Sequence, residues 1–186
     1  MNDADIIELY WSRSESAISE TSNKYGGYCN TIAMNILNNP EDSEECVSDT
    51  FLGVWNNIPP ERPSLFKAYL GSITRNFALN RYKAYFTKKR GGGTVEQLLS
   101  ELEDCIPSKH NVETEYEAGV VAALISGFLS SIDKEKRLIF IRRYWYADKI
   151  TAISKRYSVS ENNVKSMLHR TRLKLKEHLE KEGVTV

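Results

Sequence analysis

The sequence predicts an all-α protein made of two small helical domains joined by a flexible linker, with a helix-turn-helix in the C-terminal domain. Apolar residues recur at helical spacing along most of the 186 residues. No stretch shows the alternation of apolar and polar residues, bounded by turn residues, that marks a strand. The triple glycine Gly91-Gly92-Gly93 is the clearest break in the chain. We therefore place the domains at 1–90 and 118–186, with an acidic, glycine-containing linker at 91–117. A short apolar patch, Val95 to Leu102, predicts one short helix within this linker.

The N-terminal domain begins with two predicted helical segments. The first spans residues 4–37, and Gly26-Gly27 is a point where it can bend or break, because glycine disfavours a helix interior by about 1 kcal/mol relative to alanine. The second starts at Asn39, which can cap it, and at Pro40, which suits the first turn. We expect this second helix to run to about residue 57.

A proline-rich loop and a long helix complete this domain. Pro59-Pro60-Glu61-Arg62-Pro63 must be a loop, because three prolines in five residues cannot continue a helix. From Ser64 a helical pattern runs to about Arg90. Its predicted apolar stripe is Phe66, Leu70, Ile73 and Phe77, and its predicted opposite face carries Arg75, Ala78 and Tyr82.

The C-terminal domain shows four helical patterns. One covers about 113–129, and a second runs from a cap at Asp133 to Trp145. A third covers 148–157, and the fourth follows Ser160, whose hydroxyl is a good N-cap. Only Ser158-Val159 separates these last two, which is the spacing of a helix-turn-helix, although its usual turn glycine is replaced by Ser158.

The helix after Ser160 has one apolar and one polar side. The apolar stripe is Val164, Leu168, Thr171, Leu175 and Leu179. Asn162, Ser166 and His169 lie roughly opposite, flanked by basic residues. Amide and amino groups in this position can read base edges in the major groove. For an isolated helix a solvated basic face would be the simpler interpretation, and the preceding helix and turn favour DNA.

The net charge of zero hides strong blocks of charge. Residues 1–61 hold 11 acidic and 2 basic side chains, whereas 62–90 hold 8 basic and no acidic ones. Residues 134–178 hold 13 basic against 4 acidic side chains. Two basic blocks predict two cationic contact surfaces, with acidic surface left for another partner.

The basic block over 62–90 interleaves cations with aromatic residues. Cations neutralise phosphates, and aromatic faces can stack on the bases of a separated strand. The helical spacing favours a core position for most of the aromatic residues. We expect Phe66, Tyr69 and Phe77 to be largely buried. The better DNA candidates are Arg75, Asn76, Arg81 and Lys83.

Catalytic, metal and export signals are weak in this chain. Cys29, Cys46 and Cys105 form no C-x-x-C and are expected to be reduced thiols, and no histidine completes a metal site or a triad. We expect no enzyme activity, no cofactor and no metal. The start of the chain is acidic and lacks the features of a signal peptide, so we expect a cytoplasmic protein without membrane insertion. The carboxylates of residues 41–49 fit either a docking surface or a solvated face.

With these residues in view, the chain resembles a bacterial RNA polymerase sigma factor of the extracytoplasmic-function type. Residues 41–55 and 66–80 resemble the second conserved region of that family. Residues 132–137 and 164–172 resemble its fourth region. Met167 departs from the usual Arg, and Ala152-Ile153-Ser154 departs from the usual Glu-Ile-Ala. A lost Arg removes a phosphate contact, which weakens affinity without changing sequence preference.

The resemblance implies a role for each surface. The partners it implies are core RNA polymerase and promoter DNA, as duplex and as separated strand, and such factors can also have an anti-sigma factor. The polymerase-binding residues would be Asp42, Glu45 and Asp49. The downstream (−10) element and strand opening would involve Asn56, Asn57, Arg62, Arg75, Asn76, Asn80, Arg81 and Lys83, with the loop at about 56–63 holding a flipped base. The upstream (−35) element would meet Glu161, Asn162, Asn163, Lys165, Ser166, His169, Arg170, Arg172 and Lys174.

One alternative remains at this stage. A stand-alone helix-turn-helix regulator would bind an operator duplex directly and would need no polymerase. Such a protein would gain nothing from the basic block over 62–90, so dependence on polymerase discriminates between the two hypotheses.

Overall fold

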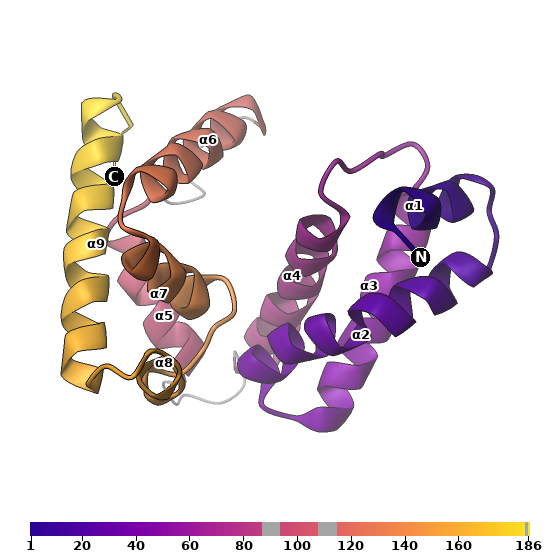
Figure 1. Ribbon diagram of the computed structural model, residues 1–186, viewed down its shortest axis with the longest axis horizontal. Coiled ribbons are helices and arrows are strands. Elements are labelled where there is room, and N and C mark those ends of the chain that lie inside the picture. Colours follow the sequence, from indigo (N-terminus) through magenta and orange to yellow (C-terminus); the bar gives the residue numbers. More distant parts are fainter. Residues whose placement is uncertain (87–93, 108–114, 185) are drawn as a thin grey trace. The chain divides into compact units, whose positions relative to one another are not determined.

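The computed structural model describes residues 1–86, 94–107, 115–184 and 186, and these residues form helices and connecting turns. No strand occurs within those ranges, so the all-α prediction is confirmed. The chain divides into two compact units, Met1–Gly91 and Gly92–Val186 (Figure 1). The triple glycine and the basic residues Lys88, Lys89 and Arg90 lie outside the described residues.

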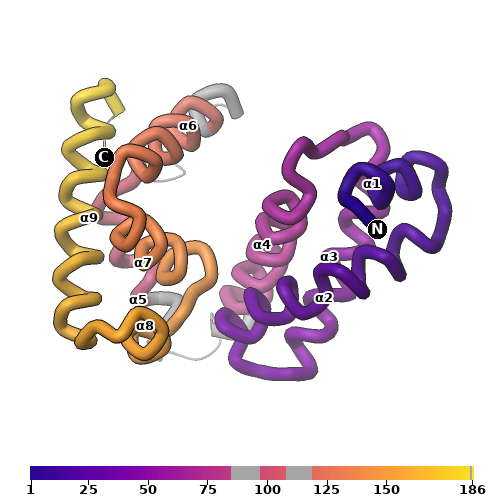
Figure 2. Tube along the Cα trace, in the orientation of Figure 1, coloured from indigo at the N-terminus to yellow at the C-terminus, as the bar shows by residue number. Residues whose placement is uncertain are grey.

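The described part of the N-terminal unit is a bundle whose apolar sides meet in one core. Its helices are α1 (Asp3–Trp11), α2 (Ser16–Leu37), α3 (Pro40–Asn57) and α4 (Phe66–Phe86). Helix α2 packs against both α3 and α4, which also contact each other, and α1 packs against α2 (Figure 2). Ile6, Tyr10, Val54, Phe66 and Leu70 are among the buried residues of this core.

The first break in the chain lies at 12–15, earlier than the sequence pattern suggested. Arg13 there adopts a left-handed conformation with φ of 54°. Gly26 and Gly27 instead lie inside α2, which continues through them. The neighbouring Tyr25 and Cys29 are both buried, and this burial offsets the helix penalty of the two glycines.

Helix α4 buries a different face from the predicted one. Phe66 and Leu70 are buried as expected, but Ala78 and Tyr82, which were predicted opposite them, are buried as well. Ile73 and Phe77 are half-buried. The prediction of a single stripe was wrong because α4 contacts both α2 and α3, so it buries an arc wider than one side of a helix.

The C-terminal unit is organised around its last helix. Its helices are α5 (Thr94–Glu103), α6 (Glu115–Ser131), α7 (Lys134–Tyr144), α8 (Ile150–Tyr157) and α9 (Glu161–Lys181). Helix α9, yellow in Figure 1, contacts α6, α7 and α8. The buried residues of α9 are Val164, Leu168, Thr171, Leu175 and Leu179, which are the five predicted from its periodicity.

Two of the three predicted helix caps form. The side chain of Asn39 accepts a hydrogen bond from the Asp42 backbone N–H at 3.2 Å, and Ser160 accepts one from Asn163 at 3.2 Å. Asp133 precedes α7 as predicted but makes no capping bond, because its carboxylate pairs with Lys136 instead.

Cys29, Cys46 and Cys105 are free and buried. Burial raises the pKa of Cys29, and it raises the pKa of Cys46 and of Cys105 to about 11. Among the described helices, none is both long and apolar enough to cross a membrane.

Candidate nucleic-acid interface

The outer face of α9 presents most of the residues predicted to read duplex DNA. The helix starts at the Ser160 cap. Because its apolar stripe is buried, the residues on the opposite side of α9 face solvent. Ser166 and Arg172 are half-buried. The remaining predicted residues are exposed, and they are Glu161, Asn162, Asn163, Lys165, His169, Arg170 and Lys174. This face therefore carries amides, cations and an imidazole, with Glu161 at its start, all accessible to a ligand.

The turn before α9 forms without a glycine. Ser158 ends α8 in the left-handed conformation, with φ of 55° and ψ of 38°, which is the conformation that favours glycine at this place. The Ser154 hydroxyl donates a hydrogen bond to the Val159 carbonyl at 2.6 Å and closes the turn from the inside. The replacement of the usual turn glycine by Ser158 therefore keeps the tight connection between α8 and α9.

Arg172 differs from the other predicted residues of α9. Its Nη1 donates to the Tyr144 hydroxyl at 2.5 Å and lies 3.4 Å from a carboxylate oxygen of Glu101. Glu101 belongs to α5, in the stretch predicted as linker. The structure thus places Arg172 against α5 and α7, at the inner edge of the face that its neighbours expose.

In the N-terminal unit, α4 carries an exposed stripe of amides and one cation. Asn76, Asn80 and Lys83 follow at intervals of four and three residues, and all three are exposed. Arg75 is half-buried, and this burial lowers the pKa of its guanidinium. The stripe of Asn76, Asn80 and Lys83 therefore offers the better surface for hydrogen bonds to DNA.

The loop after α3 is braced by α1. Arg62 in this loop donates to a carboxylate oxygen of Glu8 at 2.6 Å, and its guanidinium lies 5.1 Å from the centre of the Trp11 ring. Asn56 and Asn57 at the end of α3 are exposed. The sequence pattern did not indicate that Glu8 and Trp11 contact this loop, because both lie on α1, far along the chain from the basic block over 62–90.

Arg81 joins the predicted DNA surface to the predicted polymerase surface. Its Nη1 lies 2.7 Å from Glu45 Oε2 and its Nη2 lies 2.6 Å from Asp49 Oδ2. The hydrogen bond from Arg81 lowers the pKa of Glu45. The side chains of Glu45 and Asp49 are still 65% and 38% exposed, so a second cation can reach them. We call Glu45, Arg81 and Asp49 the acidic triad; in it, Arg81 faces carboxylates and not open solvent.

The third residue of the predicted polymerase surface, Asp42, lies in the first turn of α3 and is half-buried. Its carboxylate complements the positive end of the α3 dipole. Asp42, Glu45 and Asp49 therefore lie on one helix, as predicted from the sequence.

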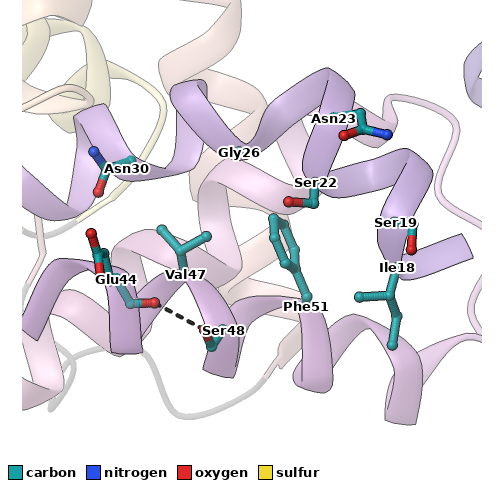
Figure 3. A pocket seen from close by; sticks show the side chains of 10 residues that line it. All are labelled: Ile18, Ser19, Ser22, Asn23, Gly26, Asn30, Glu44, Val47, Ser48 and Phe51. Carbon is teal, nitrogen blue, oxygen red and sulfur yellow. Dashed lines mark hydrogen bonds between the residues drawn. The ribbon is translucent and has the colours of Figure 1, made fainter. Parts of the chain in front are cut away.

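A groove of about 620 Å³ lies between α2 and α3 (Figure 3). Ser22, Asn23 and Asn30 of α2 lie across from Glu44 and Ser48 of α3, and apolar side chains complete the wall. Among the described residues, no cluster of three His, Cys, Asp or Glu could hold a metal here or elsewhere. The sequence pattern did not predict this groove, because it arises from the packing of two helices.

Comparison with known families identifies part of the N-terminal unit. Residues 23–85 match Sigma-70 region 2. The matched segment contains most of α2, all of α3, the proline-rich loop and nearly all of α4, so it includes the acidic triad and the exposed stripe of α4. The match covers part of the N-terminal unit and none of the C-terminal unit. No curated protein matches the chain.

Proposed function

We propose that the chain is a sigma factor of the extracytoplasmic-function type, which binds core RNA polymerase, directs it to specific promoters and helps open the DNA. The observation that carries the proposal is the Sigma-70 region 2 match over residues 23–85. The matched segment holds both a partly exposed carboxylate pair on α3, Glu45 and Asp49, and an exposed amide stripe on α4.

In this proposal the N-terminal unit docks on polymerase and holds the separated strand. The carboxylates of Asp42, Glu45 and Asp49 attract a basic partner surface, which speeds and orients docking. Asn76, Asn80 and Lys83 contact the downstream element, together with Asn56, Asn57 and Arg62 at the braced loop. Arg81 links the two surfaces, and Arg75 contributes from its half-buried position.

The C-terminal unit supplies duplex recognition. We propose that α8 and α9 form a helix-turn-helix and that α9 enters the major groove of the upstream element. The exposed amides Asn162 and Asn163 are suited to reading base edges, whereas Lys165, Arg170 and Lys174 are suited to phosphates. Splitting the work between two units separates sequence readout in the duplex from capture of the opened strand.

The docking surface can be tested by removing its charge without changing its shape. In the variant that combines Glu45→Gln with Asp49→Asn, the amide oxygens can still accept hydrogen bonds from Arg81, so the contact between α3 and α4 is kept. We expect the affinity for purified core polymerase to fall about tenfold or more, measured with a fluorescently labelled chain.

The matched control combines Glu103→Gln with Asp104→Asn, which removes the same charge from an exposed site of the other unit. This control should bind polymerase like the unchanged chain. Equal affinity of all three proteins would contradict the assignment of the docking surface.

The stand-alone regulator is the second candidate, and the exposed face of α9 is the observation that favours it. A regulator would bind one specific duplex tightly in the absence of polymerase. The sigma factor that we propose would gain its sequence preference when polymerase is added, so electrophoretic mobility shifts with and without core polymerase distinguish the two.

A further inference from the structure

Helix α5 lies in the stretch predicted as a linker with one short helix, and it packs within the C-terminal unit. Leu98 is 2% exposed and Cys105, just beyond the helix, is 1% exposed. Between them on the same side of the chain, the Glu101 side chain is 18% exposed. A segment with these burials is packed as part of a fold.

Glu101 is the centre of a hydrogen-bonded cluster that joins three helices. It accepts hydrogen bonds from the Tyr144 hydroxyl at 2.8 Å and from Arg143 Nη2 at 3.2 Å, both on α7. It also lies 3.4 Å from Nη1 of Arg172 on α9, and that same nitrogen donates to Tyr144 at 2.5 Å. Burial and the neighbouring Glu101 carboxylate raise the pKa of Tyr144, so its hydroxyl stays protonated and can donate.

The cluster is buried enough for its geometry to matter. The Arg143 side chain is 2% exposed, and its charge is compensated by Glu101 inside the unit. The Arg172 side chain is 16% exposed, so it is far less accessible than the predicted DNA contacts beside it. Charge-assisted hydrogen bonds in such a setting fix the orientation of the groups that they join.

Resting on the proposed function, we propose that Glu101 is a positioning residue for DNA recognition, which acts on α9 through Arg172 and Tyr144. Arg172 then helps DNA binding by holding the helix against α5 and α7, and it does not touch a phosphate itself. The stretch between the two DNA-contacting surfaces thereby contributes a functional residue to one of them.

Salt dependence separates this role from direct phosphate contact. Each phosphate neutralised by a cation releases counterions, so the logarithm of the affinity falls as the logarithm of the salt concentration rises. Losing one phosphate contact makes this negative slope shallower by about 0.9. A positioning residue leaves the number of phosphate contacts unchanged, so its loss weakens binding while the slope stays the same.

The experiment uses the full chain in complex with core polymerase. The probe is a duplex that the unchanged complex enriches from a random-sequence pool, and its affinity is measured over a series of potassium chloride concentrations. We expect Glu101→Gln and Arg172→Gln each to weaken binding about tenfold, on the scale of one charge-assisted hydrogen bond, with the slope unchanged. The double variant should be no weaker than Glu101→Gln alone, because the contact between Arg172 and Glu101 is already lost in that single variant.

Two further variants calibrate the result. Lys165→Gln removes an exposed cation of α9 and should make the salt slope shallower by about 0.9. Tyr144→Phe removes the hydroxyl between Glu101 and Arg172 without removing a charge, and it should weaken binding with the slope unchanged. This conservative variant keeps the test decisive if Glu101→Gln does not fold, and thermal melting of each protein identifies that case.

The positioning role would be overturned if Arg172→Gln made the salt slope shallower as Lys165→Gln does. It would also be overturned if Tyr144→Phe and a folded Glu101→Gln bound DNA like the unchanged chain. Additive losses in the double variant would also overturn it. A complex of the unchanged chain that enriches no duplex would instead refute the proposed function, and the inference with it.

Discussion

Arg81 is paired with two of the three carboxylates that form the predicted polymerase surface of α3. Glu45 and Asp49 are one helical turn apart, and two like charges at this spacing on a helix repel each other. The guanidinium of Arg81 binds one oxygen of each at 2.7 and 2.6 Å and offsets this repulsion. Each carboxylate keeps a second oxygen for a partner.

The hydrogen bond from Arg81 should be visible in the titration of Glu45. In Arg81→Gln we expect the pKa of Glu45 to rise from its lowered value toward the ordinary 4.5. Since the folded pKa is lowered, the pairing stabilises the unit above about pH 4.5 and is lost as the pH falls through the lowered value. Carboxyl resonances followed by nuclear magnetic resonance would measure the shift.

Lys83→Gln is the matched control for this titration, because it removes an equal charge two residues further along α4, from an exposed side chain. Its Glu45 should titrate as in the unchanged chain. An equal pKa in Arg81→Gln and in the unchanged chain would show that the triad does not form in solution.

The buried cysteines allow a second test at this scale. Because burial raises the pKa of Cys46 and Cys105 to about 11, their thiolates should be scarce at pH 8 and their alkylation by iodoacetamide very slow. Unfolding in urea should make all three cysteines react at the rate of free thiols. Rapid labelling of the folded chain, detected by mass spectrometry, would contradict their burial.

At the scale of elements, the turn between α8 and α9 is strained at one residue. Ser158 carries a left-handed backbone, which costs a residue with a side chain about 1–2 kcal/mol. Ser158→Gly should therefore stabilise the unit by about 0.5–1 kcal/mol after the larger entropy loss of glycine is subtracted. Hydrogen exchange of the α8 and α9 amides would measure the gain.

Lys155→Gly supplies the control, because it places glycine inside α8, where it should destabilise the helix by about 1 kcal/mol. If Ser158→Gly lowered the protection of these amides against hydrogen exchange as Lys155→Gly does, the left-handed conformation of Ser158 would be contradicted.

Two glycines of the N-terminal bundle should respond oppositely to alanine. A Cβ at Gly27 in α2 would meet nothing within 4 Å, so Gly27→Ala should stabilise by about 0.5–1 kcal/mol. A Cβ at Gly71 in α4 would lie 2.2 Å from the Tyr28 hydroxyl oxygen, so Gly71→Ala should destabilise by about 1–3 kcal/mol.

Urea unfolding followed by tryptophan fluorescence would test this pair. Trp145→Phe in all proteins confines the signal to Trp11 and Trp55 of the N-terminal unit. Equal responses of the two alanine variants would contradict the close packing of α4 on α2.

Across the two units, the sequence predicts the features that depend on residue spacing within a single helix. The Asn39 and Ser160 caps and the buried stripe of α9 were predicted correctly, because each depends on spacing within one helix. The acidic helix and the exposed residues of α9 followed from the same reasoning. The family resemblance then suggested what these surfaces bind.

The errors lie where two helices meet. A one-sided stripe could not predict the burial of Ala78 and Tyr82, because it ignores that α4 has two neighbours. The pairing of Arg81 joins residues 36 and 32 positions apart, and that of Arg172 with Glu101 spans 71. No local pattern indicates such partners, so the sequence could not show that either arginine is paired within its own unit.

The central claim is that this chain gives core RNA polymerase its choice of promoter. Transcription of genomic fragments by purified core polymerase, with and without the chain, tests it most directly. We predict start sites that appear only when the chain is present, each preceded by two shared DNA elements. An identical set of start sites in both reactions would contradict the account.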